Sequence, residues 1–212
     1  MCIRDRRETV SVEPFQPVDM APFYNALPFT LTDAQRRCVE EAIADMQSGK
    51  PMNRLCQGDV GSGKTMVAAA CVYFCIKNGH QAALMAPTEL LAEQHYRGLA
   101  PLLERLNIRC ALLTGSTPAK TKRSVTAQLA TGEIDFAIGT HALISGGVAY
   151  ADLGLVVTDE QHRFGVAQRT ALAEKGEHPH TLVMSATPIP RTLALILYGD
   201  LDVSVIDLSL IH

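Results

Sequence analysis

The stretch that decides the fold reads GDVGSGKT and runs from Gly58 to Thr65. It matches the pattern G-x-x-x-x-G-K-[ST] and stands between a short apolar run, 54–57, and a segment of helical length, 65–78. Glycines in such a loop let backbone N–H groups turn inward around phosphate oxygens, and the helix N-terminus adds a favourable dipole. The pattern predicts a nucleotide-binding loop made of Gly58, Asp59, Val60, Gly61, Ser62, Gly63, Lys64 and Thr65.

Two side chains of this loop have expected chemical roles. Lys64 is expected to reach the β and γ phosphates of ATP, and the Thr65 hydroxyl to bind Mg²⁺. A chance glycine-rich turn is the alternative interpretation. The strand before the loop and the helix after it are the context that the motif requires, so they favour the phosphate loop.

Apolar runs alternate with helix-length segments on both sides of the loop. Parallel strands covered on both faces read as continuous apolar runs, and helices between them argue for an α/β fold with a central, mostly parallel sheet. Thr32 is expected to cap a helix that ends near Gly49. The expected strands are 54–57, 82–86, 110–114, 136–138, 153–158 and 181–184, and the other expected helices are 65–78, 89–106, 117–131 and 166–175.

Two carboxylates follow the apolar run 153–158. A strand that ends in Asp159 and Glu160 places Asp159 at the carboxyl edge of the sheet, where ligands of open α/β folds bind. Asp159 is expected to hold Mg²⁺ through water, and Glu160 to orient and deprotonate an attacking water. Lys64, Asp159 and Glu160 are therefore the predicted catalytic residues. A solvated loop entrance is the alternative interpretation of the carboxylate pair.

Composition restricts the class of protein further. The chain has 212 residues with 47% hydrophobic and 19% charged residues, which suits one globular domain. A net charge of −3 requires any phosphate recognition to be local.

The six cysteines lack zinc or disulfide spacing, which fits reduced thiols in the cytoplasm. No apolar stretch of membrane length and no leader sequence is evident, so a cytoplasmic protein without a membrane segment is expected.

The two ends of the chain differ from its middle. Residues 1–28 contain four prolines and little periodicity, which indicates a linker, and the domain is expected over 29–207. Residues 1–6 and 208–212 look foreign to the domain and resemble translated adapter sequence. The sequence is therefore expected to be a fragment of a longer protein.

The runs DEQHRFGVAQR (159–169) and MSATPIPRTLA (184–194) carry a resemblance. They resemble motifs II and III of superfamily 2 helicases, specifically the RecG-type ATP-dependent DNA helicases. The related transcription-repair coupling factors usually read DEEHRFGV, so Gln161 favours the RecG type. The resemblance implies a RecA-like motor domain that uses ATP and Mg²⁺ and acts on branched DNA, at replication forks and recombination junctions, in DNA repair and recombination.

The resemblance also assigns residues beyond the phosphate loop. It implies that Gln35 recognises adenine, although a surface glutamine on a helix is an open alternative. Helix capping by Thr88 and a strand end stopped by prolines after Thr187 are likewise compatible with the sequence. Arg163 and Phe164 are typical of this branch and have no assigned task. The implied DNA contacts are Pro87, Thr88, Gly115, Ser116, Thr140 and His141, and the implied coupling residues are His162, Ser185, Ala186 and Thr187.

Two parts of the implied parent enzyme are missing from the 212 residues. These are the wedge domain that engages branched DNA and the second RecA-like domain that supplies arginine fingers. The chain alone is therefore expected to show little ATP turnover. The alternatives are a translocase domain of the transcription-repair coupling type, a small P-loop phosphotransferase without use for Glu160, and a nucleotide-binding switch without turnover.

Overall fold

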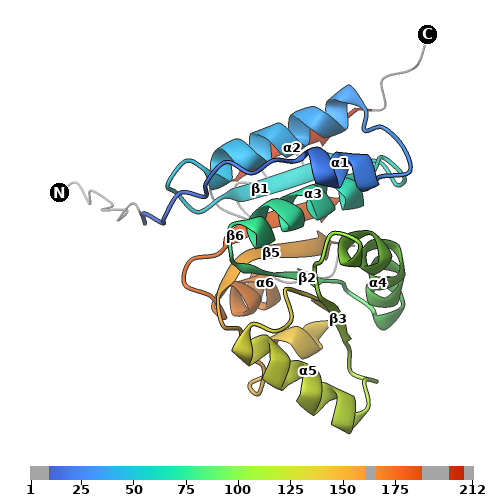
Figure 1. The fold of residues 1–212 in the computed structure, drawn as a ribbon, viewed down its shortest axis with the longest axis vertical. Coiled ribbons are helices and arrows are strands. Elements are labelled where there is room, and N and C mark those ends of the chain that lie inside the picture. Colours follow the sequence, from blue (N-terminus) through green and yellow to red (C-terminus); the bar gives the residue numbers. More distant parts are fainter. Residues whose placement is uncertain (1–9, 161–165, 188–200, 208–212) are drawn as a thin grey trace, which may run out of the picture.

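A parallel sheet forms the centre of the molecule (Figure 1). The computed structural model describes residues 10–160, 166–187 and 201–207, and over these residues the sheet has seven strands. Their order is β3-β4-β2-β5-β6-β1-β7, and every neighbouring pair is parallel. The strands are β1 (Asn53–Gly58), β2 (Gln81–Met85), β3 (Cys110–Leu113), β4 (Phe136–Gly139), β5 (Leu153–Glu160), β6 (His180–Ser185) and β7 (Asp202–Ile206).

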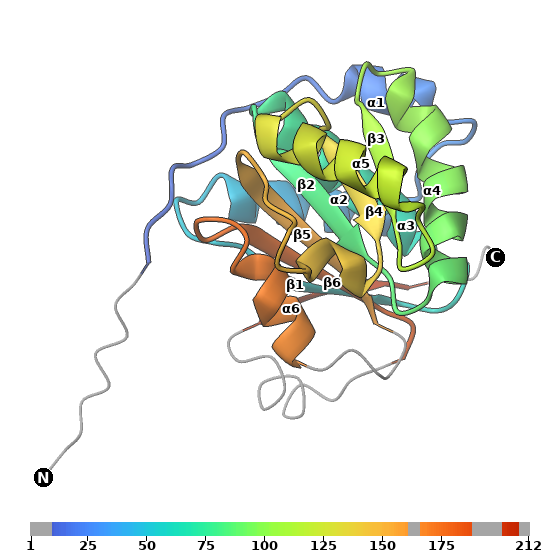
Figure 2. The same cartoon turned by 90° about the horizontal axis from the view of Figure 1, so that it is seen from below.

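Helices cover both faces of the sheet, as Figure 2 shows. One buried cluster joins the sheet to α1–α4, and a second joins its other face to α5, α6 and the 3-10 turn η1. This arrangement confirms the predicted α/β fold with helices on both faces. The helices are α1 (Ala21–Ala26), α2 (Asp33–Met46), α3 (Lys64–Lys77), α4 (Glu89–Glu104), α5 (Ala119–Thr131), η1 (His141–Ile144) and α6 (Val166–Ala173).

The helix predicted to begin after Thr32 shows how local sequence sets an element. The Thr32 side chain accepts a hydrogen bond from Gln35 N, while the Gln35 side chain accepts one from Thr32 N, so the two residues form a capping box. The helix ends at Met46, earlier than predicted. Gly49 has a φ of 77° and belongs to the turn that leads into β1, because a left-handed residue cannot continue the helix.

Residues 10–28, which the sequence predicts to be part of a linker, pack on the domain. Phe15 is 7% exposed and Phe23 fully buried, and α1 begins with Pro22 in its first turn, where proline is tolerated. Val12 N also donates to Gly49 O at 3.0 Å. Two isolated aromatic residues give no periodic signal, which is why the segment was not predicted to be structured. The expected foreign ends, 1–6 and 208–212, lie outside the described residues.

Strand β7 was not predicted, and a buried arginine of β1 links it to α2. Arg54 in β1 is 8% exposed and donates to Asp45 Oδ2 at 2.7 Å and to Glu41 Oε2 at 3.1 Å, both in α2. It also donates to Ser204 Oγ in β7 at 2.7 Å. A buried guanidinium requires such partners. This contact with Ser204 spans 150 positions, so no local sequence pattern reveals it.

His180 predicts a loss of stability in acid. Its Nδ1 accepts a hydrogen bond from Met52 N at 2.9 Å, and burial, with the charge of His80, lowers the pKa of His180 to about 4. The unfolded chain binds a proton on this histidine below about pH 6.5, whereas the folded chain does not. The free energy of unfolding should therefore be highest above pH 6.5 and fall by up to about 3 kcal/mol toward pH 4.

Chemical denaturation between pH 7.5 and 4 checks this expectation. His180→Asn keeps an acceptor near the Met52 amide but does not titrate, so its stability should depend less on pH over this range. Equal pH dependence of the variant and the wild-type chain would contradict the assignment to His180.

Two further features concern the described helices and cysteines. None of the described helices has the length and apolar character needed to cross a membrane. The cysteines that the structure describes, Cys38, Cys56, Cys71, Cys75 and Cys110, are all free thiols.

Candidate nucleotide and DNA site

The loop 58–65 connects the carboxyl end of β1 to the first turn of α3. Gly61 and Gly63 have φ values of 81° and 86°, a conformation that residues with a Cβ rarely adopt. Ser62 is 2% exposed, and its Oγ has no hydrogen-bond partner among the described residues. A buried hydroxyl without a partner costs free energy, so its presence within the loop fits a polar ligand there.

Lys64 lies across this loop. Its Nζ donates to Gly58 O at 2.6 Å and to Asp59 O at 2.7 Å. Burial lowers the pKa of Lys64, and the charges of Asp159 and Asp59 act in the opposite direction. The ammonium is therefore held inside the loop and near the Asp159 carboxylate, where it can exchange carbonyl partners for phosphate oxygens.

Gln35 reaches the same loop from the first turn of α2. Its Nε2 donates to Ser62 O at 2.8 Å, and a Cβ on Gly63 would overlap its amide group. The structure thus brings Gln35 to the phosphate loop, although its side chain also caps α2. An amide has two donor hydrogens, so one remains for another partner.

The Asp-Glu pair lies close to the loop because, among the described strands, β6 alone separates β5 from β1. Asp159 pairs in register with Met184, and Glu160 with Ser185. Ser185 in turn pairs with Gln57, the residue before the loop. The strand register therefore brings the backbones of Glu160, Ser185 and the start of the phosphate loop side by side, whereas the sequence predicted only that Asp159 lies at the carboxyl edge of the sheet.

The segment after β6 is held by local hydrogen bonds. Ser185 Oγ accepts from Thr187 N at 3.3 Å and donates to Thr187 O at 3.2 Å. This turn holds Ala186 and Thr187 at the carboxyl edge of the sheet. His162, Arg163 and Phe164 lie outside the described residues.

Possible metal ligands are few at this site. No group of three or more His, Cys, Asp or Glu side chains among the described residues could hold a metal ion. The predicted ligands Thr65 and Asp159 are a hydroxyl and a carboxylate, and such a pair suits Mg²⁺ when nucleotide phosphates and water supply the other oxygens.

The expected DNA contacts follow three other strands at the same sheet edge. Thr88, after β2, caps α4 by accepting from Leu91 N at 3.3 Å. Thr88, Gly115, Ser116 and His141 are exposed, whereas Pro87 is half-buried. Thr140 is 2% exposed, and its hydroxyl is without a partner among the described residues. Parallel strands thus gather these residues, apart from the buried Thr140 side chain, on an accessible edge.

A carboxylate already engages part of this edge. Glu89 Oε1, in the first turn of α4, accepts from Ser116 N at 2.9 Å. Hydrogen bonds from Ser116, assisted by Gly115 and by the charge of His141, lower the pKa of Glu89. The donors at this edge therefore bind an anionic group in the structure, which is the chemistry that a DNA phosphate requires.

His95 is a residue whose contact the sequence did not reveal. Its Nε2 lies 2.6 Å from Asp159 Oδ2. His95 follows Thr88 by seven residues, so it lies two turns further along α4. The predicted helix contained it, but the packing of α4 against the end of β5 depends on tertiary structure.

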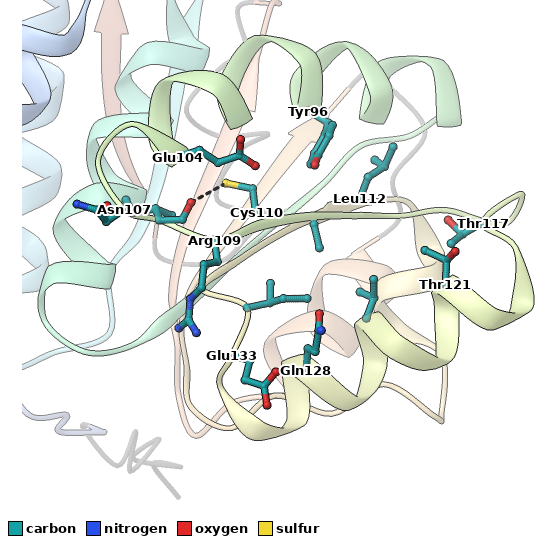
Figure 3. A pocket seen from close by; sticks show the side chains of 14 residues that line it. Tyr96, Glu104, Asn107, Arg109, Cys110, Leu112, Thr117, Thr121, Gln128 and Glu133 are labelled. Carbon is teal, nitrogen blue, oxygen red and sulfur yellow. Dashed lines mark hydrogen bonds between the residues drawn. The ribbon is translucent and has the colours of Figure 1, made fainter.

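A separate cleft lies away from this site. It has a volume of about 1030 Å³ and follows the outer side of β3, between α4 and α5. Figure 3 shows Tyr96 and Glu104 on the α4 side of Cys110 and Leu112, with Thr121 and Gln128 on the α5 side. None of the predicted site residues lines this cleft, although Thr117, next to the predicted DNA contact Ser116, does.

Comparison with known proteins gives close relatives. The chain is 57% identical over 182 residues to the ATP-dependent DNA helicase RecG of Streptococcus pneumoniae, covering 86% of this chain and 27% of that protein. It is 52% identical over 204 residues to RecG of Bacillus subtilis, covering 96% of this chain and 30% of that protein. The chain therefore spans less than a third of the length of these relatives.

Solved structures agree with this similarity. A structure of RecG bound to a three-way DNA junction matches with a TM-score of 0.82 and 48% identity, over 96% of this chain and 27% of that chain. The helicase MrfA bound to DNA matches with a TM-score of 0.67 at 18% identity, over 92% of this chain and 31% of that chain, which is a likeness of fold alone. The fold is that of a RecA-like helicase domain.

A family model supplies the broadest comparison. The model of the DEAD/DEAH box helicases matches residues 32–196. That range includes Gln35, the phosphate loop, the Asp-Glu pair and Ser185. The chain resembles RecG and belongs to the DEAD/DEAH box helicase family.

Proposed function

We propose that residues 29–207 are the first RecA-like motor domain of an ATP-dependent helicase or translocase that acts on branched DNA. The forks and junctions of replication and recombination are its proposed substrates, in DNA repair and recombination. The observation that carries the proposal is the strand register. The phosphate loop follows β1, Ser185 ends β6 and Glu160 ends β5, and these three strands are neighbours in the sheet. The similarity to RecG favours DNA as the polymer on which this motor acts.

Each residue of the nucleotide site has a proposed role. Lys64 binds the β and γ phosphates, Gln35 recognises adenine, and Glu160 accepts a proton from the attacking water. Thr65 and Asp159 hold Mg²⁺, which neutralises phosphate charge when bound. A cleft of about 310 Å³ at the start of α2, lined by Leu31 and Arg36 among others but not by Gln35, offers room for a base.

The proposed DNA surface lies along the neighbouring strand ends. Thr88, Gly115, Ser116 and His141 are exposed there, and backbone N–H groups and hydroxyls are suitable phosphate partners. Because Glu89 already accepts from Ser116 N, a DNA phosphate at this place has to replace the Glu89 carboxylate. Ser185, Ala186, Thr187 and His162 are the proposed link between this surface and the nucleotide.

The remaining proposals concern the longer protein. A wedge domain and a second RecA-like domain are its proposed partners, since the chain spans only 27% of the S. pneumoniae relative. We also propose a cytoplasmic location, because the proposed substrate is DNA and because the described cysteines are free thiols.

A chimera tests the proposed function. Residues 29–207 would replace the equivalent segment of B. subtilis RecG, which is 52% identical over the aligned region. The chimera is expected to separate the strands of a fluorescently labelled model fork when ATP and Mg²⁺ are present, and to lose this activity with Lys64→Ala. A folded chimera that binds the fork and ATP but never separates the strands would contradict the proposal.

A further inference from the structure

The imidazole of His95 contacts the carboxylate that is proposed to hold Mg²⁺. Its Nε2 is 2.6 Å from Asp159 Oδ2, and the two side chains are only 12% and 18% exposed. One oxygen of the carboxylate is thus held by the ring.

Helix α4 fixes the position of the ring. The helix is capped by Thr88, and Glu89 ties its first turn to Ser116. Further along, Leu99 and Leu103 are fully buried against the sheet. His95 is therefore presented by a rigid element, and a side chain on such an element can hold a carboxylate in one orientation.

Asp159 has a competing partner in Lys64. The Asp159 charge is among the causes that raise the pKa of Lys64 against the effect of burial. A carboxylate free to turn would form an ion pair with that ammonium, which would neutralise Lys64 and occupy Asp159 together. A hydrogen bond from His95 opposes this pairing, because it holds Oδ2 on the α4 side.

We propose that His95 is a positioning residue that holds Asp159 in the orientation required for nucleotide-bound Mg²⁺. The inference rests on the proposed function, since it needs a Mg·ATP site in the loop 58–65. Groups that hydrogen-bond a metal ligand typically change metal affinity by about ten- to a hundredfold when they are removed. In this proposal His95 acts on the nucleotide site only through Asp159, so it is a positioning residue and not a catalytic residue.

Calorimetric titration of the 212-residue chain with ATP tests the proposal without requiring turnover. Each protein is titrated once with Mg²⁺ and once in EDTA, and the ratio of the two dissociation constants measures the contribution of the metal. His95→Asn, whose amide is too short to reach Asp159, is expected to lower this ratio about tenfold or more and to leave the EDTA constant unchanged. His95→Gln extends its amide toward the place of Nε2 and should retain most of the ratio.

A second His–Asp contact on the same sheet provides the control. His80 Nδ1 lies 2.8 Å from Asp152 Oδ2, at the opposite end of β5 from Asp159. Asp152→Asn breaks the charged contact there and should leave the ratio unchanged. Any variant that loses folded protein loses binding sites in both titrations, so the ratio, taken with the fitted stoichiometry, still reports on the metal alone.

The outcomes separate the two proposals. If the wild-type chain binds ATP no better with Mg²⁺ than in EDTA, the proposed Mg·ATP site is wrong and the role of His95 is overturned with it. If Mg²⁺ strengthens binding to the wild-type chain and equally to His95→Asn, the nucleotide site stands and only the positioning role is overturned. Equal loss of the ratio in His95→Asn and His95→Gln would also overturn it, because the amide of Gln would then fail to replace the imidazole.

Discussion

Glu160→Gln in the chimera with B. subtilis RecG is expected to bind Mg·ATP normally and to lower its hydrolysis about a hundredfold or more. Glutamine is nearly isosteric with glutamate, but its amide cannot accept the proton of the attacking water. Glu160 ends β5 and pairs in register with Ser185, so the substitution leaves the backbone of the site unchanged. Steady-state phosphate release and calorimetric titration with ATP measure the two effects separately.

A matched substitution controls for loss of a negative charge. Glu174, just after α6, is exposed, and Glu174→Gln should leave both turnover and affinity unchanged. Unchanged turnover in Glu160→Gln would remove this residue from the proposed role. Parallel losses of affinity and turnover would instead indicate a disrupted site.

Lys64→Ala is expected to weaken Mg·ATP binding by the 212-residue chain about tenfold or more, since a charge-assisted hydrogen bond contributes about 1.5–3 kcal/mol. In the structure the Lys64 ammonium already lies inside the loop, on Gly58 O and Asp59 O. Removing it takes away the cation nearest to the expected phosphates. Calorimetry on the wild-type and variant chains measures the change.

Lys77→Ala is the matched control for this experiment. Lys77 ends the same helix, where its ammonium lies 5.4 Å from the centre of the Tyr73 ring, away from the loop. Its substitution should leave ATP affinity unchanged. Equal affinities for Lys64→Ala and the wild-type chain would rule out the phosphate-loop assignment.

The parts of the fold that the sequence predicted depend on local chemistry. A phosphate loop needs particular residues at fixed spacing between a strand and a helix, so Gly58 to Thr65 could be identified without any tertiary contact. The same holds for the helix cap at Thr32, whereas the part that Gln35 plays in the capping box came from the structure. Once the strands are parallel, their carboxyl ends meet at one edge, which explains why the separate motifs come together.

The features that were missed depend on contacts between distant residues. The positions of His95 against Asp159 and of Arg54 against Ser204 follow from helix and strand packing, which no local pattern encodes. Phe15 and Phe23 are buried by partners elsewhere in the chain. The local sequence of the segment 10–28 shows only its prolines, and it therefore predicts a linker. Glu89 could be read as a helix-dipole residue, but its bond to Ser116 required the structure.

We propose that this domain binds ATP yet needs a second motor domain to hydrolyse it at a useful rate. Steady-state ATP hydrolysis by the 212-residue chain and by the chimera, each with a model DNA fork, tests this most directly. An arginine finger from a second body contributes about a thousandfold or more, so the chain alone should turn over at least that much more slowly than the chimera. A DNA-stimulated rate of about one per second or faster from the 212-residue chain would contradict the claim.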